Sequence, residues 1–179
     1  MSKQWLAVGL LVAGLGLGGF ALARAGRAIT GVEVGNEAPD YRTVDLATGD
    51  SVSLHERYRG SVTLVNIWAT WCAPCREEMP AMQAAYDSLR GRGFRVVAVS
   101  IDQSDSTAVR AFVEELGLTF DILHDRTGAI QRVYQTTGVP ESFLLDREGR
   151  IVRRVIGAHD WSSGVNRDLV QRLLADGGA

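Results

Sequence analysis

The order of strands and helices along the chain predicts an α/β protein with a mixed central sheet flanked by helices. Two nearly continuous apolar runs, Val62–Trp68 and Phe94–Ile101, are rich in β-branched residues, as strands covered on both faces are. Each run is followed by a segment whose apolar residues recur at steps of three and four, which is typical of one face of a helix. Two further strands around the turn at 147–149 predict a hairpin, so the sheet combines parallel and antiparallel pairs.

The individual elements follow from the same patterns. A β-hairpin is expected at Tyr41–Leu54, because apolar and polar residues alternate around the turn-rich stretch 47–50. The helix after the first buried strand starts near Ala73 and ends near Gly91 or Gly93. The remaining expected elements are a helix over 109–116, a short strand over 120–123, a helix over 127–134, strands over 142–145 and 151–156, and a C-terminal amphipathic helix around 169–174.

Length and charge limit the range of functions. A chain of 179 residues can bury one ordinary globular core, with room for a short appendage. Its formal charge is -2, and its Lys and Arg residues are scattered rather than gathered in a stripe. Binding of nucleic acid needs a concentrated positive surface, so no nucleic-acid partner is expected.

The N-terminal segment 5–23 is uncharged and apolar, with Lys3 before it and Arg24 after it. About 20 such residues can cross a bilayer as a helix. We expect a single-pass signal anchor, and we rank a buried core helix last because the segment has no polar face. A cleaved signal peptide is the main alternative, since Ala21-Leu22-Ala23 resembles a processing site, although the apolar run exceeds the usual length of about 7 to 15 residues.

This interpretation divides the chain into four parts. Residues 1–4 form a cytoplasmic N-terminus, 5–23 the transmembrane signal anchor, 24–35 a linker, and 36–179 the folded domain. The domain is then expected to face the periplasm or another extracytoplasmic space from the inner membrane.

The chain has two cysteines, and both lie in the motif Cys72-Ala73-Pro74-Cys75. Without further thiols there is none to mispair in an oxidising compartment, and none to form a structural disulfide framework. A zinc site needs four ligands, and the only other candidates are three isolated histidines, His55, His124 and His159. The motif therefore favours redox chemistry, for which no cofactor and no bound metal are expected.

The expected position of Cys72 explains how this chemistry would work. A strand ending near Ala69 and a helix starting near Ala73 place Cys72 at a helix N-terminus, where free backbone N–H groups favour an anion. That position lowers the pKa of a thiol below its ordinary value of about 8.5, so Cys72 is the expected attacking thiolate. Cys75 lies on the same helix face, should be more buried, and can resolve a mixed disulfide. Pro74 suits the first turn of a helix, because no N–H is needed there.

Two sequence segments carry a resemblance to a known group. Residues 66–80, which contain the Cys-x-x-Cys motif, and residues 138–146, which read Gly-Val-Pro-Glu-Ser-Phe-Leu-Leu-Asp, resemble the TlpA/ResA/CcmG group of membrane-anchored thioredoxin-like proteins. The resemblance runs from about Asn36 to the C-terminus. It implies a thioredoxin-like fold with an N-terminal β-hairpin and a central αβ insertion. It also implies an extracytoplasmic thiol-disulfide oxidoreductase that reduces protein disulfides, often in cytochrome c maturation, and is itself re-reduced by a membrane electron donor.

The resemblance assigns roles to particular residues. Cys72 and Cys75 would form the redox-active disulfide, and Pro140 would be a cis-proline facing them. A cis bond after Val139 would leave the backbone of that residue free to pair with a bound peptide. Trp71 and Pro74 are expected beside the cysteines on the surface that meets the substrate.

Glu78 is the third candidate catalytic residue, because it follows Cys75 by one helical turn and could exchange protons with the thiols. It matches the active-site glutamate of the group. Thioredoxin itself has a buried aspartate at the position equivalent to Asn66, and because asparagine cannot titrate, Glu78 could supply the missing acidic group. The structural alternative is that Glu77 and Glu78 are simply favourable near the positive end of a helix. Glu141 matches a Pro-Glu-Thr-Phe element of the cytochrome-maturation members, although Ser142 replaces the threonine here.

The direction of electron flow and two other functions remain open at this stage. The dipeptide Ala-Pro between the cysteines is closer to the Gly-Pro of thioredoxin than to a strong oxidant, which favours a reductant. A copper(I) chaperone, or a reductase for a copper-site assembly protein, would use the two thiolates, with His124 or His159 as a third ligand in the chaperone. A peroxiredoxin-like peroxidase with antioxidant activity shares the fold, but the approach to Cys72 lacks the proline that such enzymes carry.

Overall fold

A computed structural model describes residues 31–176 of the chain. The predicted anchor at 5–23 and the residues before it lie outside this part, as does most of the predicted linker. Among the described residues, none of the helices combines the length and the apolar character that a membrane span requires.

Seven strands form one mixed sheet in the order β2-β1-β5-β4-β3-β6-β7. β3 pairs in parallel with β4 and antiparallel with β6, and β6 forms the predicted antiparallel hairpin with β7. The mixed α/β architecture predicted from the sequence is therefore confirmed. The strands are β1 (Arg42–Asp45), β2 (Ser51–Ser53), β3 (Val62–Trp68), β4 (Phe94–Ser100), β5 (Asp121–His124), β6 (Glu141–Leu145) and β7 (Ile151–Ile156).

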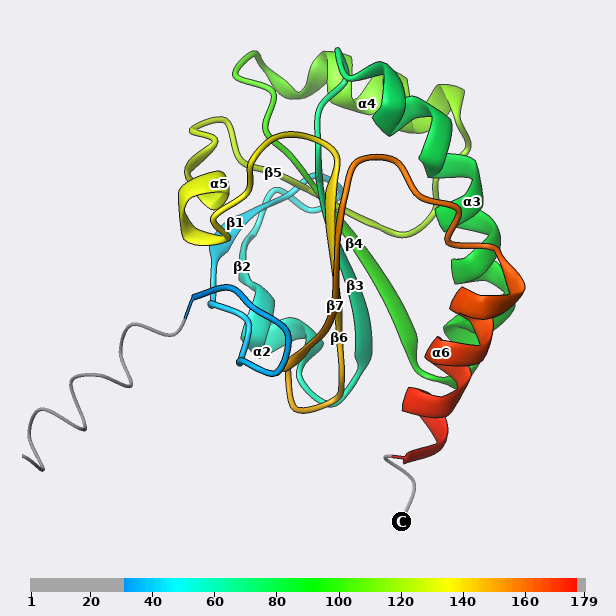
Figure 1. The fold of residues 1–179 in the computed structure, drawn as a ribbon. Coiled ribbons are helices and arrows are strands. Elements are labelled where there is room, and N and C mark those ends of the chain that lie inside the picture. The colour runs from blue at the N-terminus through cyan, green and yellow to red at the C-terminus, as the bar shows by residue number, and fades with distance from the viewer. Residues whose placement is uncertain (1–30, 177–179) are drawn as a thin grey trace, which may run out of the picture. The chain divides into compact units, whose positions relative to one another are not determined.

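Helices cover both sides of this sheet. Figure 1 shows α3 and α6 on one side and α2 and α5 on the other, with α4 above α3. The guanidinium of Arg76 on α3 lies 4.5 Å from the ring centroid of Phe112 on α4, and that ring packs on Trp68 of β3. The helices are α2 (Leu54–Tyr58), α3 (Ala73–Leu89), α4 (Ser106–Glu115), α5 (Ala129–Val133) and α6 (Gly164–Asp176), with a short 3₁₀ turn η2 (Arg90–Arg92) after α3.

β3 occupies the middle of the core. All seven of its residues are buried, as its continuous apolar sequence predicts for a strand covered on both faces. Its antiparallel register with β6 places Asn66 opposite Ser142 and Ile67 opposite Glu141. The strand ends only a few residues before Cys72, so the core itself determines where the Cys-x-x-Cys motif begins.

The N-terminal hairpin extends the sheet on the other side. β1 and β2 pair antiparallel, as predicted, and β1 also pairs with β5 through Val44 and His124. The central αβ insertion corresponds to α4 and β5, which therefore connect the hairpin to the core strands. The sequence patterns did not predict α2, whose N-cap Ser53 accepts a hydrogen bond from the backbone N–H of Glu56. Five residues are too few to show a helical period.

Residues just before the predicted domain start also contact the sheet. Val32 is buried, and its carbonyl accepts a hydrogen bond from Arg154. The backbone N–H of Gly35 donates to the carbonyl of Ile151 at 2.8 Å. This stretch thus runs against β7, while the boundary proposed between linker and domain stays a prediction.

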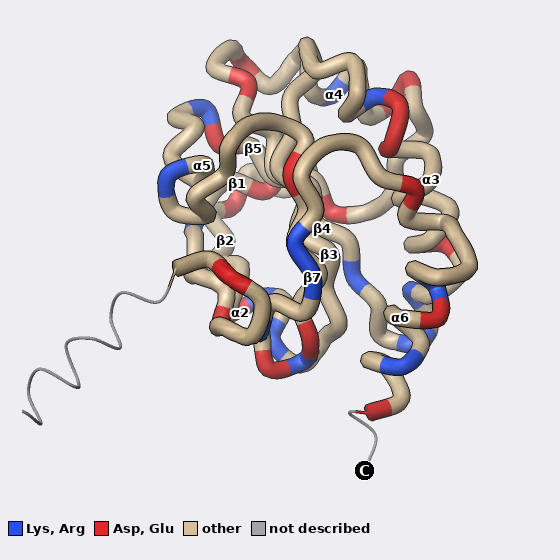
Figure 2. Tube along the Cα trace, viewed as in Figure 1, with Lys and Arg blue, Asp and Glu red and all other residues tan. Residues whose placement is uncertain are grey.

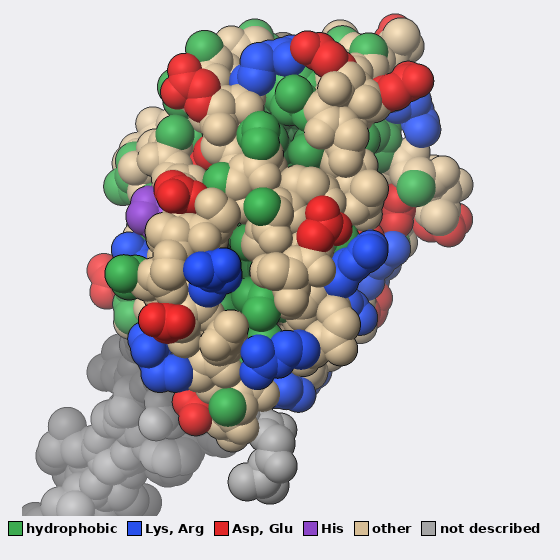
Figure 3. Space-filling view, turned by 90° about the vertical axis from the view of Figure 1, so that its right-hand side faces the viewer, with side chains coloured by type: hydrophobic (Ala, Val, Ile, Leu, Met, Phe, Trp, Pro, Cys, Tyr) green, Lys and Arg blue, Asp and Glu red, His purple; other side chains and the backbone are tan. Residues whose placement is uncertain are grey.

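The outer face of the molecule beside α3 and α6 carries charges of both signs. Figure 3 shows acidic, basic and hydrophobic side chains intermixed over this face. Such intermixing is ordinary for a protein surface exposed to water, and it gives this face no electrostatic potential of a single sign.

The burial of residues along β7 predicts how two substitutions affect the free energy of unfolding. Ile151 is 1% exposed, so Ile151→Ala should lower the free energy of unfolding by about 2 to 5 kcal/mol, because it leaves a cavity in the core. Ile156, on the same strand, is 64% exposed, and Ile156→Ala should change it by no more than about 0.5 kcal/mol. Urea denaturation of both variants measures the difference. Equal losses for the two isoleucines would contradict the placement of Ile151 in the core.

Candidate active site

Cys72 and Cys75 are joined by a disulfide bond at the start of α3. Cys72 is the N-cap of the helix, and its Sγ accepts a hydrogen bond from the backbone N–H of Cys75 at 3.2 Å. Cys75 is fully buried, whereas Cys72 keeps 4% of its surface exposed. The difference agrees with the expectation that Cys75 is the less accessible sulfur. Cys72 is therefore the sulfur that another thiol or disulfide can reach more easily.

The loop between β3 and the disulfide is held by Asp102, which the sequence patterns did not single out. Its carboxylate accepts hydrogen bonds from the backbone N–H of Thr70 at 3.0 Å and from the Thr70 hydroxyl at 2.6 Å. It also accepts from the hydroxyl of Ser100 at 2.7 Å. Asp102 lies two residues after the end of β4, whose last residue, Ser100, pairs with Trp68 at the end of β3. The pairing of these two strands therefore brings Asp102 to the loop that follows β3.

The second loop of the site precedes β6. The Val139–Pro140 peptide bond is cis, as expected, and Pro140 is buried. Because Ile67 pairs with Glu141, the antiparallel register places Pro140 opposite Trp68, at the end of β3 that leads to the disulfide. The sheet therefore brings the loop 136–140 and the Cys-x-x-Cys motif to the same edge.

Glu78 is buried one turn after Cys75, and within residues 31–176 it forms no salt bridge. Its Oε1 accepts a hydrogen bond from Asn66 Nδ2 at 2.7 Å, and its Oε2 accepts from the backbone N–H of His159 at 3.0 Å. Burial raises the pKa of Glu78 from its ordinary value of 4.5 to about 7, against the opposing effect of these two hydrogen bonds. A carboxyl group with such a pKa can both take up and release a proton near neutral pH.

Asn66 connects the carboxyl group to the second loop. Its Nδ2 also donates to the hydroxyl of Ser142 at 2.9 Å, so it bridges α3 and β6 from the centre of the sheet. Among the described residues its Oδ1 has no hydrogen-bond partner, although the side chain is fully buried. Ser142, the residue that departs from the Thr of the related element, is thus part of the network around Glu78.

Trp71 and Trp68 have different environments. Trp68 is fully buried in the core, as expected, while Trp71 is 68% exposed next to Cys72. Trp71 borders an open cleft of about 460 Å³ whose other wall includes Gln103 and Gln131. Pro74 is also exposed. The surface around Cys72 is therefore open to a macromolecular partner.

The ring nitrogens of the three histidines contact groups other than the cysteines. His124 Nε2 contacts the carbonyl of Asp102 at 2.8 Å, His55 Nε2 contacts the carbonyl of Ala38 at 2.6 Å, and His159 Nε2 pairs with Asn166. Within residues 31–176, no group of three or more His, Cys, Asp or Glu side chains is arranged to hold a metal ion. His159 takes part in the site through its backbone N–H rather than its ring.

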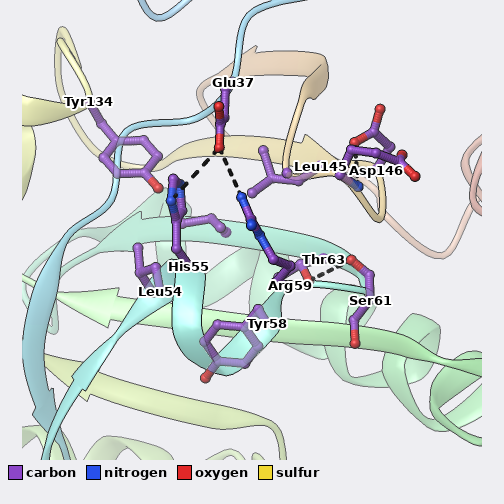
Figure 4. A pocket seen from close by; sticks show the side chains of 13 residues that line it. Glu37, Leu54, His55, Tyr58, Arg59, Ser61, Thr63, Tyr134, Leu145 and Asp146 are labelled. Atoms are coloured by element: carbon purple, nitrogen blue, oxygen red, sulfur yellow. Dashed lines mark hydrogen bonds and ion pairs between the residues drawn. The ribbon is translucent and has the colours of Figure 1, made fainter.

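A small pocket lies at the opposite end of β3 and β6, near Ser61 and Asp146. Figure 4 shows Tyr134 beside His55, and Glu37 between His55 and Arg59 with an ion pair to each. Its free volume of about 20 Å³ is enough for a single water molecule. Because it contains neither cysteine, this pocket is separate from the redox site.

Comparisons with known proteins agree on one group. Residues 34–154 match the AhpC/TSA family. The chain is 34% identical to the thiol-disulfide oxidoreductase ResA of Bacillus thuringiensis subsp. konkukian over 126 residues, which cover 70% of this chain and 71% of that protein. It is 37% identical over 154 residues to the thioredoxin-like protein YneN of Bacillus subtilis, covering 84% and 88% of the two chains.

Solved structures show the same fold. A thioredoxin-family thiol:disulfide interchange protein from Chlorobium tepidum superposes with a TM-score of 0.66 at 26% identity, over 78% of this chain and 96% of that one. StoA of Bacillus subtilis superposes with a TM-score of 0.59 at 25% identity, over 76% and 96%. The thioredoxin-like architecture predicted from the sequence resemblance is therefore confirmed.

Burial of Glu78 predicts how stability depends on pH. The folded protein holds the Glu78 proton up to about pH 7, while the unfolded chain releases it near pH 4.5, so stability falls as the pH rises between these values. The Glu78→Gln variant cannot titrate at this position, so its stability should not show this fall. Compared with that variant, the free energy of unfolding of the oxidised wild-type protein should decrease by on the order of 3 kcal/mol between pH 4.5 and 7, as measured by urea denaturation.

The exposed neighbour Glu77 is the matched control for this experiment. Glu77→Gln should preserve the wild-type pH dependence between pH 4.5 and 7. A parallel pH dependence for wild type and Glu78→Gln would show that folding does not raise the pKa of Glu78.

Proposed function

This chain belongs to the AhpC/TSA family and, within it, to the ResA-like thiol-disulfide oxidoreductases, and we propose that it reduces protein disulfides outside the cytoplasm. The observation that carries the proposal is the Cys72–Cys75 pair at the N-terminus of α3, with the less buried sulfur first. Reduction would free a Cys72 thiolate at the positive end of a helix, where the anion is stabilised.

The reaction proceeds in two exchanges. The Cys72 thiolate attacks one sulfur of the substrate disulfide, a mixed disulfide forms, and the other substrate sulfur leaves as a thiolate. Cys75 then attacks Cys72, which releases the second substrate thiolate and closes the Cys72–Cys75 disulfide. The proton that Cys75 loses passes to the carboxylate of Glu78, one turn away on the same buried face of α3. Two electrons move from the dithiol to the substrate.

The loop before β6 supplies the contact with the substrate backbone. Val139 is only partly buried and precedes Pro140 at the same sheet edge as the disulfide. Its free backbone groups would pair with an extended segment of the substrate, as in strand addition. Trp71 and Pro74, both exposed beside Cys72, would pack against the same segment.

The cellular setting follows from the N-terminal sequence. We propose that residues 5–23 anchor the chain in the inner membrane and that a membrane electron donor re-reduces the disulfide. Apocytochrome c is the substrate class that the sequence resemblance to the TlpA/ResA/CcmG group implies. The absence of any cysteine other than Cys72 and Cys75 suits work in an oxidising compartment.

Neither alternative activity has equal structural support. A copper(I) chaperone would need a third ligand, but the ring nitrogens identified for His124 and His159 contact Asp102 and Asn166. A peroxidase is compatible with the family, but the approach to Cys72 lacks the proline of the Pro-x-x-x-Thr/Ser-x-x-Cys pattern that such enzymes carry. Consumption of peroxide in the absence of a thiol substrate would favour that activity.

Removal of the resolving sulfur should trap the substrate. In Cys75→Ser, the mixed disulfide at Cys72 has no nearby thiol to break it, so covalent complexes should accumulate when the full-length variant is produced in its host. They should be visible on non-reducing gels and disappear on reduction. The Cys72→Ser control should trap far fewer, because Cys75 is fully buried. Equal trapping by both variants would exclude Cys72 as the specific nucleophile.

A redox titration tests the direction of electron flow. Equilibration of the protein with glutathione buffers should give a reduction potential nearer to that of thioredoxin, about -270 mV, than to that of DsbA, about -120 mV. A potential above roughly -150 mV would assign the chain to the oxidants and would contradict the reductase proposal.

A further inference from the structure

Arg154 on β7 contacts three separate segments around the substrate-binding loop. Its Nε donates to Glu141 Oε1 at 2.5 Å, its Nη1 to the carbonyl of Val32 at 3.1 Å, and its Nη2 to the carbonyl of Gln135 at 2.8 Å. The basic stretch on β7 that contains it is visible in Figure 2. All three nitrogens of the guanidinium are thus used, as its planar fork allows.

Glu141 extends this arrangement into the loop. Its side chain is completely buried, and its Oε2 accepts a hydrogen bond from the backbone N–H of Thr137 at 2.9 Å. One carboxylate oxygen therefore faces Arg154 and the other faces the loop. Each oxygen thus already accepts a hydrogen bond, and the charge of Glu141 is paired with that of Arg154, which suits a fixed structural role.

The two residues hold both ends of the loop 136–140. Gln135, just before it, has φ +49°, a left-handed conformation that residues with a side chain rarely adopt. Such a conformation persists only where the surroundings determine it, and Arg154 holds the carbonyl of this residue. At the other end, Glu141 follows Pro140 directly and ties Thr137 back to the start of β6.

The energetics of the Arg154–Glu141 ion pair indicate its role in the fold. The Glu141 side chain is fully buried and that of Arg154 is 23% exposed. Such a pair contributes little net stability, because the cost of removing its charges from water offsets their attraction. Loss of one partner, however, leaves the other uncompensated. The pair is therefore better explained by the single conformation that it imposes on the loop than by a gain in stability.

We propose that Arg154 and Glu141 are positioning residues for the substrate, which hold the loop 136–140 so that the Val139 backbone is ready to pair with an extended peptide. This inference rests on the proposed function, because it assigns that loop to substrate binding. The pair takes no part in the exchange between sulfurs. Through Val32, the same guanidinium also ties the chain on the N-terminal side of the domain to the loop.

The test compares Arg154→Lys and Glu141→Gln with Arg153→Lys in the full-length reduced protein. Lysine at position 154 keeps the charge but cannot reach three acceptors with a fork, and glutamine at 141 keeps the shape but removes the charge. Arg153 is the matched control, because it lies next to Arg154 on β7 and donates instead to Asn166 Oδ1. Insulin serves as the disulfide substrate.

Both loop variants should raise KM for insulin about tenfold, the effect of one lost charge-assisted hydrogen bond. The rate at which iodoacetamide alkylates Cys72 should stay unchanged, since that reaction needs no loop. Amide hydrogen exchange at Thr137, Gly138 and Val139 should become faster in both variants. Arg153→Lys should change none of the three measurements, and the double variant should add little to either single one.

The outcomes separate this inference from the proposed function. Unchanged hydrogen exchange in the loop, or an unchanged KM in a folded Arg154→Lys protein, would overturn the positioning role. A fall in Cys72 alkylation parallel to the rise in KM would also overturn it, because the effect would then reach the sulfurs. If the wild-type protein does not reduce insulin or trap substrates, the proposed function fails, while hydrogen exchange still reports whether the pair orders the loop.

Discussion

The burial of β3 at the centre of the sheet is the constraint from which the site follows. Every residue of this strand is shielded from water, and it pairs with β4 on one side and β6 on the other. Pairing on both sides fixes the position of the last residue of β3. The chain therefore enters α3 at a defined place, with Cys72 as the N-cap. The same pairing with β6 brings the loop before Pro140 to the same edge.

A polar residue in this strand has consequences for its surroundings. Asn66 is fully buried, and a buried amide must find partners because its desolvation is costly. It donates to Glu78 and to Ser142, and so links α3 to β6, the strand that follows the loop 136–140. The Asn66 side chain therefore connects Glu78, the proposed proton carrier, to Ser142 on β6.

Two buried carboxyl groups near the disulfide have opposite surroundings. In the described part of the chain, Glu78 accepts hydrogen bonds from two neutral donors, and burial raises its pKa to about 7, which makes proton exchange accessible near neutral pH. Glu141 is paired with Arg154 and a backbone N–H, which suits a fixed structural charge. The environment, rather than the residue type, separates the proposed proton carrier from the positioning residue.

The sequence by itself determined the α/β class, the buried strands, the hairpins and the Cys-x-x-Cys motif at a helix start, because hydrophobic period and helix-start signals are local. It also singled out Glu78 and Pro140 through their resemblance to a known group. Asp102, the His159 backbone and the Arg154–Glu141 pair could not be found in this way. Thr70 lies 32 residues before Asp102, and Glu78 lies 81 residues before His159. Glu141 and Arg154 are only 13 residues apart, but the contact between their side chains depends on how β6 and β7 pack in the folded sheet. The tertiary structure alone decided which buried carboxylate meets a cation, because burial and charge pairing depend on contacts across the sheet.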